Sequence, residues 1–225
     1  LDHARAGLAG PGLQAELNGE SVDVCSGLDL QPGDVLHLLS EPPGLYVYFS
    51  VQGKLQAQQW LGSFSTYLPG HRGGMAGRRL RKGDVLVWEP SGAEARVGAG
   101  IQEDIFRKED LLSIRLAPGP EWPWFGPLAR EAFFSQTFII SPQTNRMGMR
   151  LQAPFGLSRR FPSIRSSATF PGLIQWPPGG RPIVLLQDGQ TTGGYPRIAA
   201  VVQEDLRRLL HGRPGERVRF VRKMD

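Results

Sequence analysis

Residues 171–198 read PGLIQWPPGGRPIVLLQDGQTTGGYPRI, and this stretch carries the clearest fold signal of the chain. Its apolar run at 183–186 is short and rich in β-branched residues, which favours a buried strand. Proline and glycine flank the run and favour turns on both sides of it. Polar residues follow directly at 187–192. The stretch therefore predicts a buried strand that delivers polar side chains at its end.

Similar short runs, rich in β-branched and aromatic residues, recur at 45–51, 85–88, 138–140 and 217–221. The 29 glycines and 19 prolines, together about a fifth of the chain, separate such runs and form no low-complexity block. This spacing favours a barrel or a sandwich over alternating βαβ units. We therefore predict a mainly β protein.

One turn sequence occurs three times, as QPGDVL at 31–36, RKGDVL at 81–86 and RPGERV at 213–218. Glycine supplies the positive φ of a tight turn, and an apolar strand follows. The intervals are unequal, so the unit is a repeated strand entry and not a solenoid repeat. It suggests that hairpin-rich lobes occur more than once.

Helix signals are few. A short helix is predicted within 124–134, with Leu128, Ala132 and Phe133 on one face, and a second at 205–210. Gly212 and Pro214 are expected to end the second helix in the manner of a C-cap. From residue 103 onward, charged residues interrupt the pattern of short strand-like runs. We predict a first β lobe at 1–102, a charged linker at 103–113 and a second β lobe at 114–225.

Bulk properties narrow the class of protein. The net charge is +5, but the arginines and lysines are scattered and form no recognisable nucleic-acid module. No apolar run approaches the roughly 18–20 residues of a membrane helix, and the N-terminus has no signal-peptide pattern. The single Cys25 excludes an internal disulfide. We expect a cytoplasmic protein with no nucleic-acid or membrane partner.

The sequence lacks the motifs of several common catalytic mechanisms. The four histidines, His3, His37, His71 and His211, are far apart and lack metal-ligand spacing, so no metal is expected. Gly-x-Ser-x-Gly is absent, which argues against the usual hydrolase elbow. The glycines of 61–84 do not form a P-loop, since no Gly-Lys-Ser/Thr follows them. No catalytic base can be assigned.

The polar end of the predicted strand is the first candidate site. Paired glycines allow a ligand to approach the backbone and leave N–H groups free for an anion. A turn-rich β-corner, in which these residues only satisfy backbone groups, is the alternative. The candidate residues are Asp188, Gln190, Thr191, Thr192, Gly193 and Gly194.

Two further stretches contribute candidates. Asn145 and Arg146 lie in SPQTNRMGMRL at 141–151, where the planar fork of Arg146 suits a carboxylate or a phosphate. An exposed loop arginine can equally be just solvated. Ser63, Ser65 and Thr66 form a hydroxyl cluster within LGSFSTY at 61–67.

Taken together, LGSFSTY, NRMGMRL, QDGQTTGGYP and the RPGERVRF segment at 213–220 resemble one family, in order and in approximate spacing. It is the family of the C subunit of 5-oxoprolinase and the Kip antagonist protein, related to allophanate hydrolase subunit 2 and to subdomains A and B of biotin-dependent carboxyltransferases such as urea carboxylase. The resemblance spans nearly the whole chain. It implies cyclophilin-like β-barrel lobes with a few short helices, and it extends the substrate-binding set to Gln175 and Tyr195.

The resemblance also implies a function: ATP-dependent opening of 5-oxo-L-proline to L-glutamate by a complex in which this chain alone is inactive. We expect ATP to bind at a site shared with a partner, namely the B subunit of 5-oxoprolinase or a Kip-inhibitor-like subunit. The lactam-hydrolase (A) component of 5-oxoprolinase is a possible further partner. Neither metal nor biotin is expected on this chain. Two alternatives stay open, a carboxyltransferase component of a urea-carboxylase-like enzyme and a non-enzymatic regulator that binds a Kip-type kinase inhibitor.

The sequence departs from the family pattern at three places. Phe64 stands where the family has an arginine, and Ser167 stands where it has an acidic residue. The family's N-terminal segment is not found, so we expect the chain to start inside the first lobe. The two substitutions remove a cation and an anion from the expected site.

Overall fold

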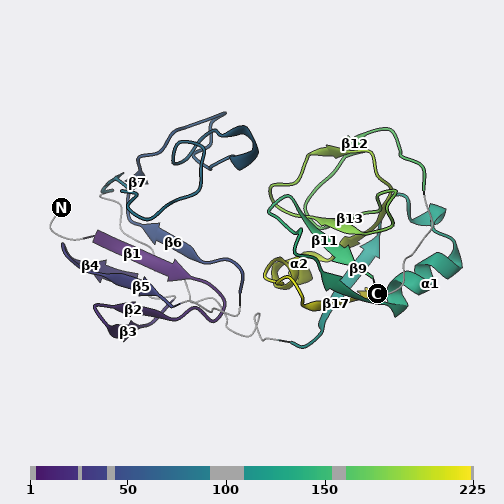
Figure 1. The fold of residues 1–225 in the computed structure, drawn as a ribbon, viewed down its shortest axis with the longest axis horizontal. Coiled ribbons are helices and arrows are strands. Elements are labelled where there is room, and N and C mark those ends of the chain that lie inside the picture. Colours follow the sequence, from purple (N-terminus) through teal and green to yellow (C-terminus); the bar gives the residue numbers. More distant parts are fainter. Residues whose placement is uncertain (1–3, 25–26, 40–43, 92–108, 154–160, 224–225) are drawn as a thin grey trace. The chain divides into compact units, whose positions relative to one another are not determined.

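The computed structural model describes residues 4–24, 27–39, 44–91, 109–153 and 161–223. The chain forms two separate units. Unit 1 comprises Leu1–Pro42 and Val47–Gln102, and unit 2 comprises Pro43–Tyr46 and Glu103–Asp225. Most of the predicted linker lies outside the described residues, and its last two positions already belong to strand β9 of unit 2. The prediction of a mainly β fold is confirmed (Figure 1).

Unit 2 is a closed seven-stranded barrel in the order β10-β11-β14-β13-β16-β9-β17. All neighbouring strands are antiparallel except β17 and β9, which run parallel. The strands at 138–140, 183–186 and 217–221 were thus predicted in nearly the right place. The barrel strands are β9 (Leu112–Pro118), β10 (Thr137–Ile140), β11 (Gly148–Gln152), β13 (Leu173–Gln175), β14 (Ile183–Leu185), β16 (Arg197–Val201) and β17 (Arg217–Arg222).

The barrel core forms because each strand turns alternate side chains inward. Val218 and Phe220 of β17 are buried while Arg217 and Arg219 are exposed. The ring of Phe133 stacks on Phe220 with centroids 5.2 Å apart, so a helix closes over this part of the core. Such aromatic pairs add roughly 0.5–1.5 kcal/mol to the burial of their apolar area.

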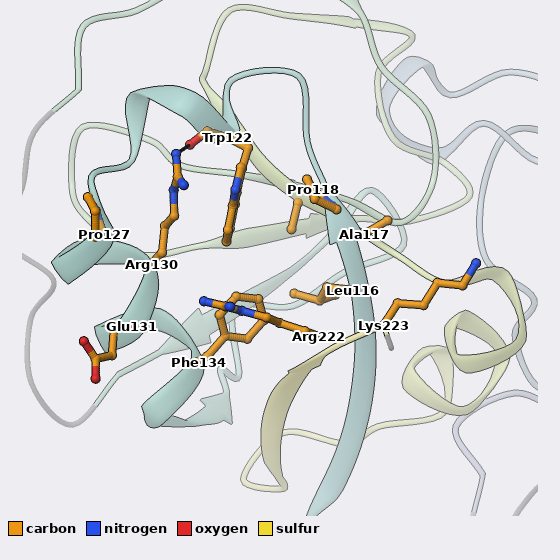
Figure 2. Close-up of a pocket in the computed structure, with 11 residues that line it drawn as sticks. Leu116, Ala117, Pro118, Trp122, Pro127, Arg130, Glu131, Phe134, Arg222 and Lys223 are labelled. Atoms are coloured by element: carbon orange, nitrogen blue, oxygen red, sulfur yellow. Dashed lines mark hydrogen bonds between the residues drawn. The ribbon is translucent and has the colours of Figure 1, made fainter. Parts of the chain in front are cut away.

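Phe133 belongs to α1 (Pro127–Ser135), which follows the 3₁₀ turn η3 (Trp122–Trp124). Arg130 Nη2 donates to the carbonyl oxygen of Trp122 at 2.8 Å and ties the two together (Figure 2). The prediction that Leu128 shares the buried face was wrong, since its exposed fraction is 82%. Phe133 comes five positions after Leu128, which places the two side chains about 140° apart around the helix axis.

The second helix, α2 (Gln203–Leu210), starts two residues earlier than predicted. The prediction that Gly212 forms a glycine C-cap of this helix was also wrong. His211 caps the helix with φ −90°, and Gly212 does not have a positive φ. Glycine is required at 212 for space, because a Cβ there would lie 2.6 Å from Ile140 Cδ1.

Unit 1 contains three small sheets in its described residues, around a core of Ala6, Leu8, Leu13, Ala15 and Leu28. The sheets are β4-β1-β6, β3-β2-β5 and β7-β8, together with the 3₁₀ turn η1 (Leu68–Gly70). The strands are β1 (Ala4–Ala9), β2 (Ala15–Leu17), β3 (Glu20–Val22), β4 (Gly27–Leu30), β5 (Leu36–Leu38), β6 (Tyr48–Val51), β7 (Lys54–Leu55) and β8 (Trp88–Glu89).

Two predicted strands of this region were too long. The run at 45–51 is strand only from Tyr48, because the backbone N–H of Tyr46 turns to His211 Nδ1, at 3.4 Å within unit 2. The run at 85–88 is strand only at its last residue. Val85 and Val87 are 75% and 49% exposed, so this β-forming sequence has no core to face.

The three repeated turns have the predicted geometry. Gly33, Gly83 and Gly215 have φ values of 92°, 89° and 93°. In each turn the acidic residue after the glycine accepts the N–H of the first turn residue, at 2.7, 2.7 and 3.0 Å. The glycine therefore supplies the backbone conformation and the carboxylate fixes the turn.

Two ion pairs with buried carboxylates hold unit 2 together. The carboxylate of Glu121 accepts the backbone N–H, Nε and Nη2 of Arg197 at 2.9, 2.7 and 2.6 Å. Arg197 Nη1 also donates to the carbonyl oxygen of Ala168 at 2.9 Å. This one guanidinium therefore links the residue before η3, strand β16 and the short strand β12 (Ser167–Ala168).

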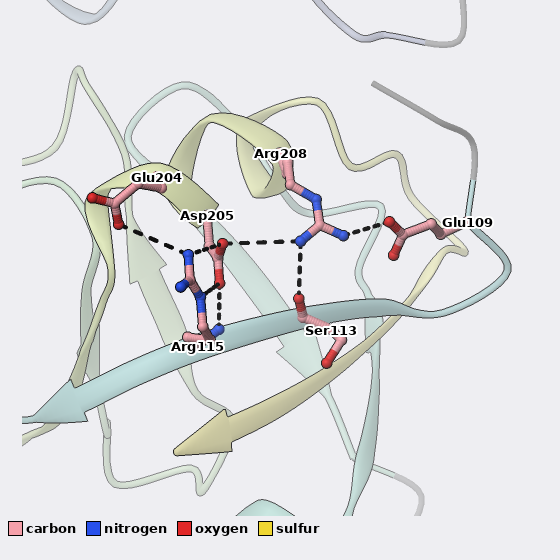
Figure 3. A network of polar contacts seen from close by, with 6 residues as sticks. All are labelled: Glu109, Ser113, Arg115, Glu204, Asp205 and Arg208. Atoms are coloured by element: carbon pink, nitrogen blue, oxygen red, sulfur yellow. Dashed lines mark hydrogen bonds and ion pairs between the residues drawn. The ribbon is translucent and has the colours of Figure 1, made fainter. Parts of the chain in front are cut away.

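The second pair joins α2 to β9. Asp205 of α2 accepts the backbone N–H, Nε and Nη2 of Arg115 at 2.7, 2.9 and 2.9 Å (Figure 3). Arg208, one helical turn further on, donates to the carbonyl oxygen of Ser113 and to the carboxylate of Glu109. The helix is thereby fixed along the strand by charged contacts as well as by buried Leu209.

We predict that Glu121→Ala will destabilise unit 2 by about 3–5 kcal/mol, because it leaves the charge of Arg197 buried without its partner. The Arg197 guanidinium lowers the pKa of Glu121, so its stabilising effect is present above the ordinary value of 4.5 and is lost as the pH falls through the lowered value. Urea unfolding followed by tryptophan fluorescence at several pH values measures both effects. As the control, Asp29→Ala breaks the exposed pair with Arg5 and should cost about 0–1 kcal/mol. Similar losses for both variants would contradict the prediction.

Candidate functional site

The candidate site lies on unit 2, where the turn between β10 and β11 meets the loop after β14. Two backbone hydrogen bonds join these segments, from Leu186 N to Met147 O at 3.0 Å and from Asp188 N to Arg146 O at 3.1 Å. The loop ends in β15 (Thr192–Gly193), which pairs with β12. The structure therefore brings together two predicted stretches that are far apart in the sequence.

Arg146 and Asp188 form a bidentate ion pair at the junction. Nε to Oδ2 measures 2.8 Å and Nη2 to Oδ1 measures 3.1 Å, with side-chain exposures of 55% and 37%. The pair uses two of the five N–H groups of the guanidinium, which leaves both N–H groups of Nη1 and one of Nη2 for a ligand. An anion at Arg146 would therefore bind beside Asp188.

Asn145 has a mainly structural part in this arrangement. Its Oδ1 accepts the backbone N–H of Met147 at 2.9 Å and that of Gly148 at 3.3 Å. Such contacts are typical of an Asx turn and fix the position of Arg146 within the turn. Only the side-chain amide nitrogen of Asn145 remains for a ligand.

Gln175 of β13 is the buried member of the site, with 1% of its surface exposed. Its Oε1 accepts a hydrogen bond from Gln190 Nε2 at 3.1 Å. Its own Nε2 is buried and has no hydrogen-bond partner among the described residues. A buried donor without an acceptor costs about 1–3 kcal/mol, so a ligand acceptor at this position would recover that free energy.

Gly193 lies against the Gln175 amide. A Cβ at 193 would be 2.5 Å from Gln175 Nε2, and the φ of Gly193 is not positive. The glycine is thus required for close approach. Ser167, the register partner of Gly193 on β12, has a buried Oγ that also lacks a partner in the part of the chain that the structure describes. One amide nitrogen and one hydroxyl without partners among the described residues therefore lie beside one glycine.

The rest of the loop is held by Thr169, a residue that sequence reasoning missed. Its backbone N–H donates to Thr191 O at 2.9 Å, and its hydroxyl donates to Gln190 O. Thr191 and Thr192 have exposed side chains, Tyr195 is 39% exposed, and Gly194 O accepts the N–H of Ile164 at 2.8 Å. No local signal marks Thr169, because its partners lie about twenty residues further along the chain.

Ser63, Ser65 and Thr66 belong to unit 1. Ser63 Oγ accepts the N–H of Ser65 at 3.1 Å, and a Cβ on Gly74 would lie 2.0 Å from Thr66 Oγ1. The rings of Trp60 and Tyr67 stack at 5.5 Å. Within unit 1 these hydroxyls are therefore parts of a tightly folded loop.

A bidentate pair follows that loop. Arg78 Nη1 and Nη2 both lie 2.8 Å from the Asp84 carboxylate. The hydrogen bonds from Arg78, and then the one from the backbone N–H of Arg81, lower the pKa of Asp84 to about 2. The same carboxylate thus closes the repeated turn at 81–84 and anchors the arginine.

The described residues contain no cluster of three or more histidine, cysteine or acidic side chains arranged to hold a metal ion. Among them, no helix has the length and hydrophobicity needed to cross a bilayer. The side chains at the candidate site carry amide, hydroxyl, guanidinium and carboxylate groups.

Comparisons with known proteins identify the relatives of the chain. The family model "Carboxyltransferase domain, subdomain A and B" matches residues 1–222. The C subunit of 5-oxoprolinase from Escherichia coli is 34% identical over 214 residues, which cover 95% of this chain and 68% of that protein. Urea amidolyase of Lachancea kluyveri is 27% identical over 229 residues, 91% of this chain and 12% of that protein. The crystal structure of TTHA0988 superposes with a TM-score of 0.80 at 33% identity and covers 98% of this chain and 42% of that one.

We predict that Gly193→Ala will displace the Gln175 side chain and destabilise unit 2 by about 1–3 kcal/mol, the usual cost of overpacking. The matched control is Gly179→Ala, where a Cβ would meet nothing within 4 Å and φ is not positive. Thermal unfolding measures the difference, and the side-chain amide signals of Gln175 in NMR spectra report the displacement. Equal stability of the two variants would show that Gly193 is not needed for the packing of Gln175.

Proposed function

The chain belongs to the family of the carboxyltransferase domain, subdomains A and B, and we propose that it is one subunit of an ATP-dependent 5-oxoprolinase. The observation that carries this proposal is the 34% identity to the C subunit of Escherichia coli 5-oxoprolinase over 95% of the chain. The reaction would open the lactam ring of 5-oxo-L-proline to L-glutamate. The chemistry of the residues in unit 2 supports this substrate.

The lactam offers groups that match the candidate site. Its carbonyl oxygen is an acceptor for the free Nε2 donor of Gln175, and its carboxylate suits the N–H groups that Arg146 retains beside Asp188. The carboxylate of Asp188 and the hydroxyl of Thr192 are acceptors for the lactam N–H. In this assignment Gln175 and Arg146 bind the lactam. Asp188 orients Arg146 and, like Thr192, offers an acceptor to the lactam N–H.

Hydrolysis of the lactam needs activation, because amides are poor electrophiles. Transfer of the γ-phosphoryl group of ATP to the lactam oxygen would release ADP and make the ring carbon open to attack by water. The carbon–nitrogen bond then breaks and the nitrogen takes up a proton, which leaves an acyl phosphate. A second water hydrolyses this acyl phosphate to glutamate and phosphate. No phosphate-binding loop sequence occurs in this chain, so we place ATP at a site shared with a partner.

Unit 1 offers a surface for such a partner. Large apolar side chains are exposed there, among them Tyr48, Leu61, Leu80 and Val85 at 65%, 83%, 59% and 75%. Exposed apolar groups of this kind mark protein interaction sites. We propose that the B subunit of 5-oxoprolinase or a Kip-inhibitor-like protein covers them, with the lactam-hydrolase (A) component as a further member of the complex.

A second function has its own support. The similarity to urea amidolyase over 91% of the chain favours a carboxyltransferase component, in which a separate biotin carrier would deliver the carboxyl group. Urea, like the lactam, presents a carbonyl acceptor and N–H donors. Unlike the lactam, it carries no carboxylate for Arg146.

The test is reconstitution. We predict that the purified chain alone releases no glutamate from 5-oxoproline, and that the co-purified A and B components together with this chain do so with ATP. Omission of this chain from the mixture is the control, and avidin, which captures biotin, should have no effect. Turnover by the isolated chain would overturn the proposal. Carboxylation of urea that requires a biotinylated carrier and stops with avidin would replace it with the second function.

We predict that Arg146→Ala will weaken the binding of 5-oxoproline to the reconstituted complex at least about tenfold, since loss of a charged hydrogen-bond partner costs ~1.5–3 kcal/mol. The pair with Asp188 is exposed, so stability should change by only about 0–1 kcal/mol. Thr192→Val should cost less than Arg146→Ala. The matched control is Arg150→Ala, which removes an exposed arginine from the strand that follows the same turn. The measurement is the KM for 5-oxoproline, and equal KM values for the Arg146 and Arg150 variants would show that Arg146 does not bind the substrate.

A further inference from the structure

One cavity of unit 2 is lined by residues that the candidate site does not use. It has a volume of about 590 Å³ and lies between η3, α1, β9 and β17 (Figure 2). Ligand pockets usually measure about 300–1,000 Å³, so a small organic molecule fits this space. Its apolar wall includes Leu116, Pro118, Trp122 and Phe134.

The charged groups of this cavity are mostly cations. Arg130, Arg222 and Lys223 line it together with one carboxylate, that of Glu131. None of the four forms an ion pair with any residue in the described ranges. This is unlike the pairs of Arg115, Arg146 and Arg197 in the same unit. The cavity therefore carries three cations against the one carboxylate of Glu131, and none of the three is ion-paired with a described residue.

The two arginines are held in place by aromatic rings. The guanidinium carbon of Arg130 lies 4.6 Å from the centroid of the Trp122 ring, and that of Arg222 lies 5.2 Å from the Phe134 ring. Figure 2 shows Arg130 standing beside Trp122 and Arg222 lying across Phe134. A guanidinium stacked on a ring uses its flat face, so the N–H groups at its edge stay available for an anion.

One of these N–H groups is buried without an acceptor. Arg130 Nη2 donates to Trp122 O, but Arg130 Nε has no hydrogen-bond partner among the described residues. If Arg130 were only a solvated surface group, its Nε would face water; Arg222, in contrast, is exposed. A buried charged donor instead has a free-energy cost that an anionic ligand would remove. Pro127, at the positive end of α1, lines the same cavity and adds to the preference for an anion.

We propose that this cavity binds a small organic anion with an aromatic body. The anionic group would contact the edges of Arg130 and Arg222, and the planar body would pack on the apolar wall beside Trp122 and Phe134. The proposal is independent of the proposed function, because none of these residues belongs to the 5-oxoproline site.

The test uses indole-3-propionate as the probe and the full chain as the protein. Ligand-observed NMR and calorimetry should give a Kd of about 1 mM or tighter. Indole-3-propionamide has the same body without the charge, and propionate has the charge without the body. Each should bind about tenfold more weakly than the probe, since each lacks one half of the recognition.

Variants locate the binding on the protein. Arg130→Met and Arg222→Met keep a long apolar side chain. Each should weaken the binding of indole-3-propionate about tenfold while leaving the affinity for indole-3-propionamide unchanged. The matched control is Arg219→Met, which removes an exposed arginine of the same strand that does not line the cavity. Ala117→Phe should block the probe by filling the space. Absence of binding, equal affinity for the probe and its amide, or equal affinity of all three arginine variants would each overturn the proposal.

Discussion

The buried guanidinium of Arg197 is the contact on which the candidate site depends most. It comes two residues after Tyr195, at the start of β16, and it donates from Nε and Nη2 to Glu121 and from Nη1 to Ala168. Ala168 pairs with Thr192, so one side chain fixes both the strand beside the polar loop and the strand after it. The side chains of the pair are each only 11% exposed. Because a buried charge is tolerated only with its partner, the position of the loop is coupled to the integrity of the barrel.

Local chemistry in the sequence predicted the parts of the fold that local chemistry determines. The three turn glycines have the positive φ that their sequence demands, and the strands at 138–140, 183–186 and 217–221 face a core on at least one side. Two of the errors arose where distant contacts decide the local structure. The strand expected at 45–47 is prevented by the contact of Tyr46 with His211, and Gly212 is explained by its closeness to Ile140.

The same distinction applies to the candidate site. Residue types identified Arg146 and Asp188 as site candidates, and the structure joins them in an ion pair. The sequence could not show that this pair forms, which changes Arg146 from a free cation into one whose charge is already partly balanced. It also could not identify Thr169, whose role depends on the register of β12 and β15. At Phe64, where the family resemblance implies an arginine, the Lys54 ammonium lies 5.9 Å from the ring centroid, so a cation lies near this position.

The other departure has a sharper consequence. The family resemblance implies an acidic side chain where Ser167 stands. The Ser167 hydroxyl and the Nε2 of Gln175 lie beside Gly193 and have no hydrogen-bond partner among the described residues. A carboxylate there could have accepted a hydrogen bond from such a donor, whereas the serine leaves the Gln175 N–H groups for a ligand acceptor. A lactam and a urea both offer a carbonyl oxygen for this purpose, so these two donors do not discriminate between them. In the proposed function, discrimination would therefore fall to the N–H groups that Arg146 retains, because only the lactam carries a carboxylate that can bind them.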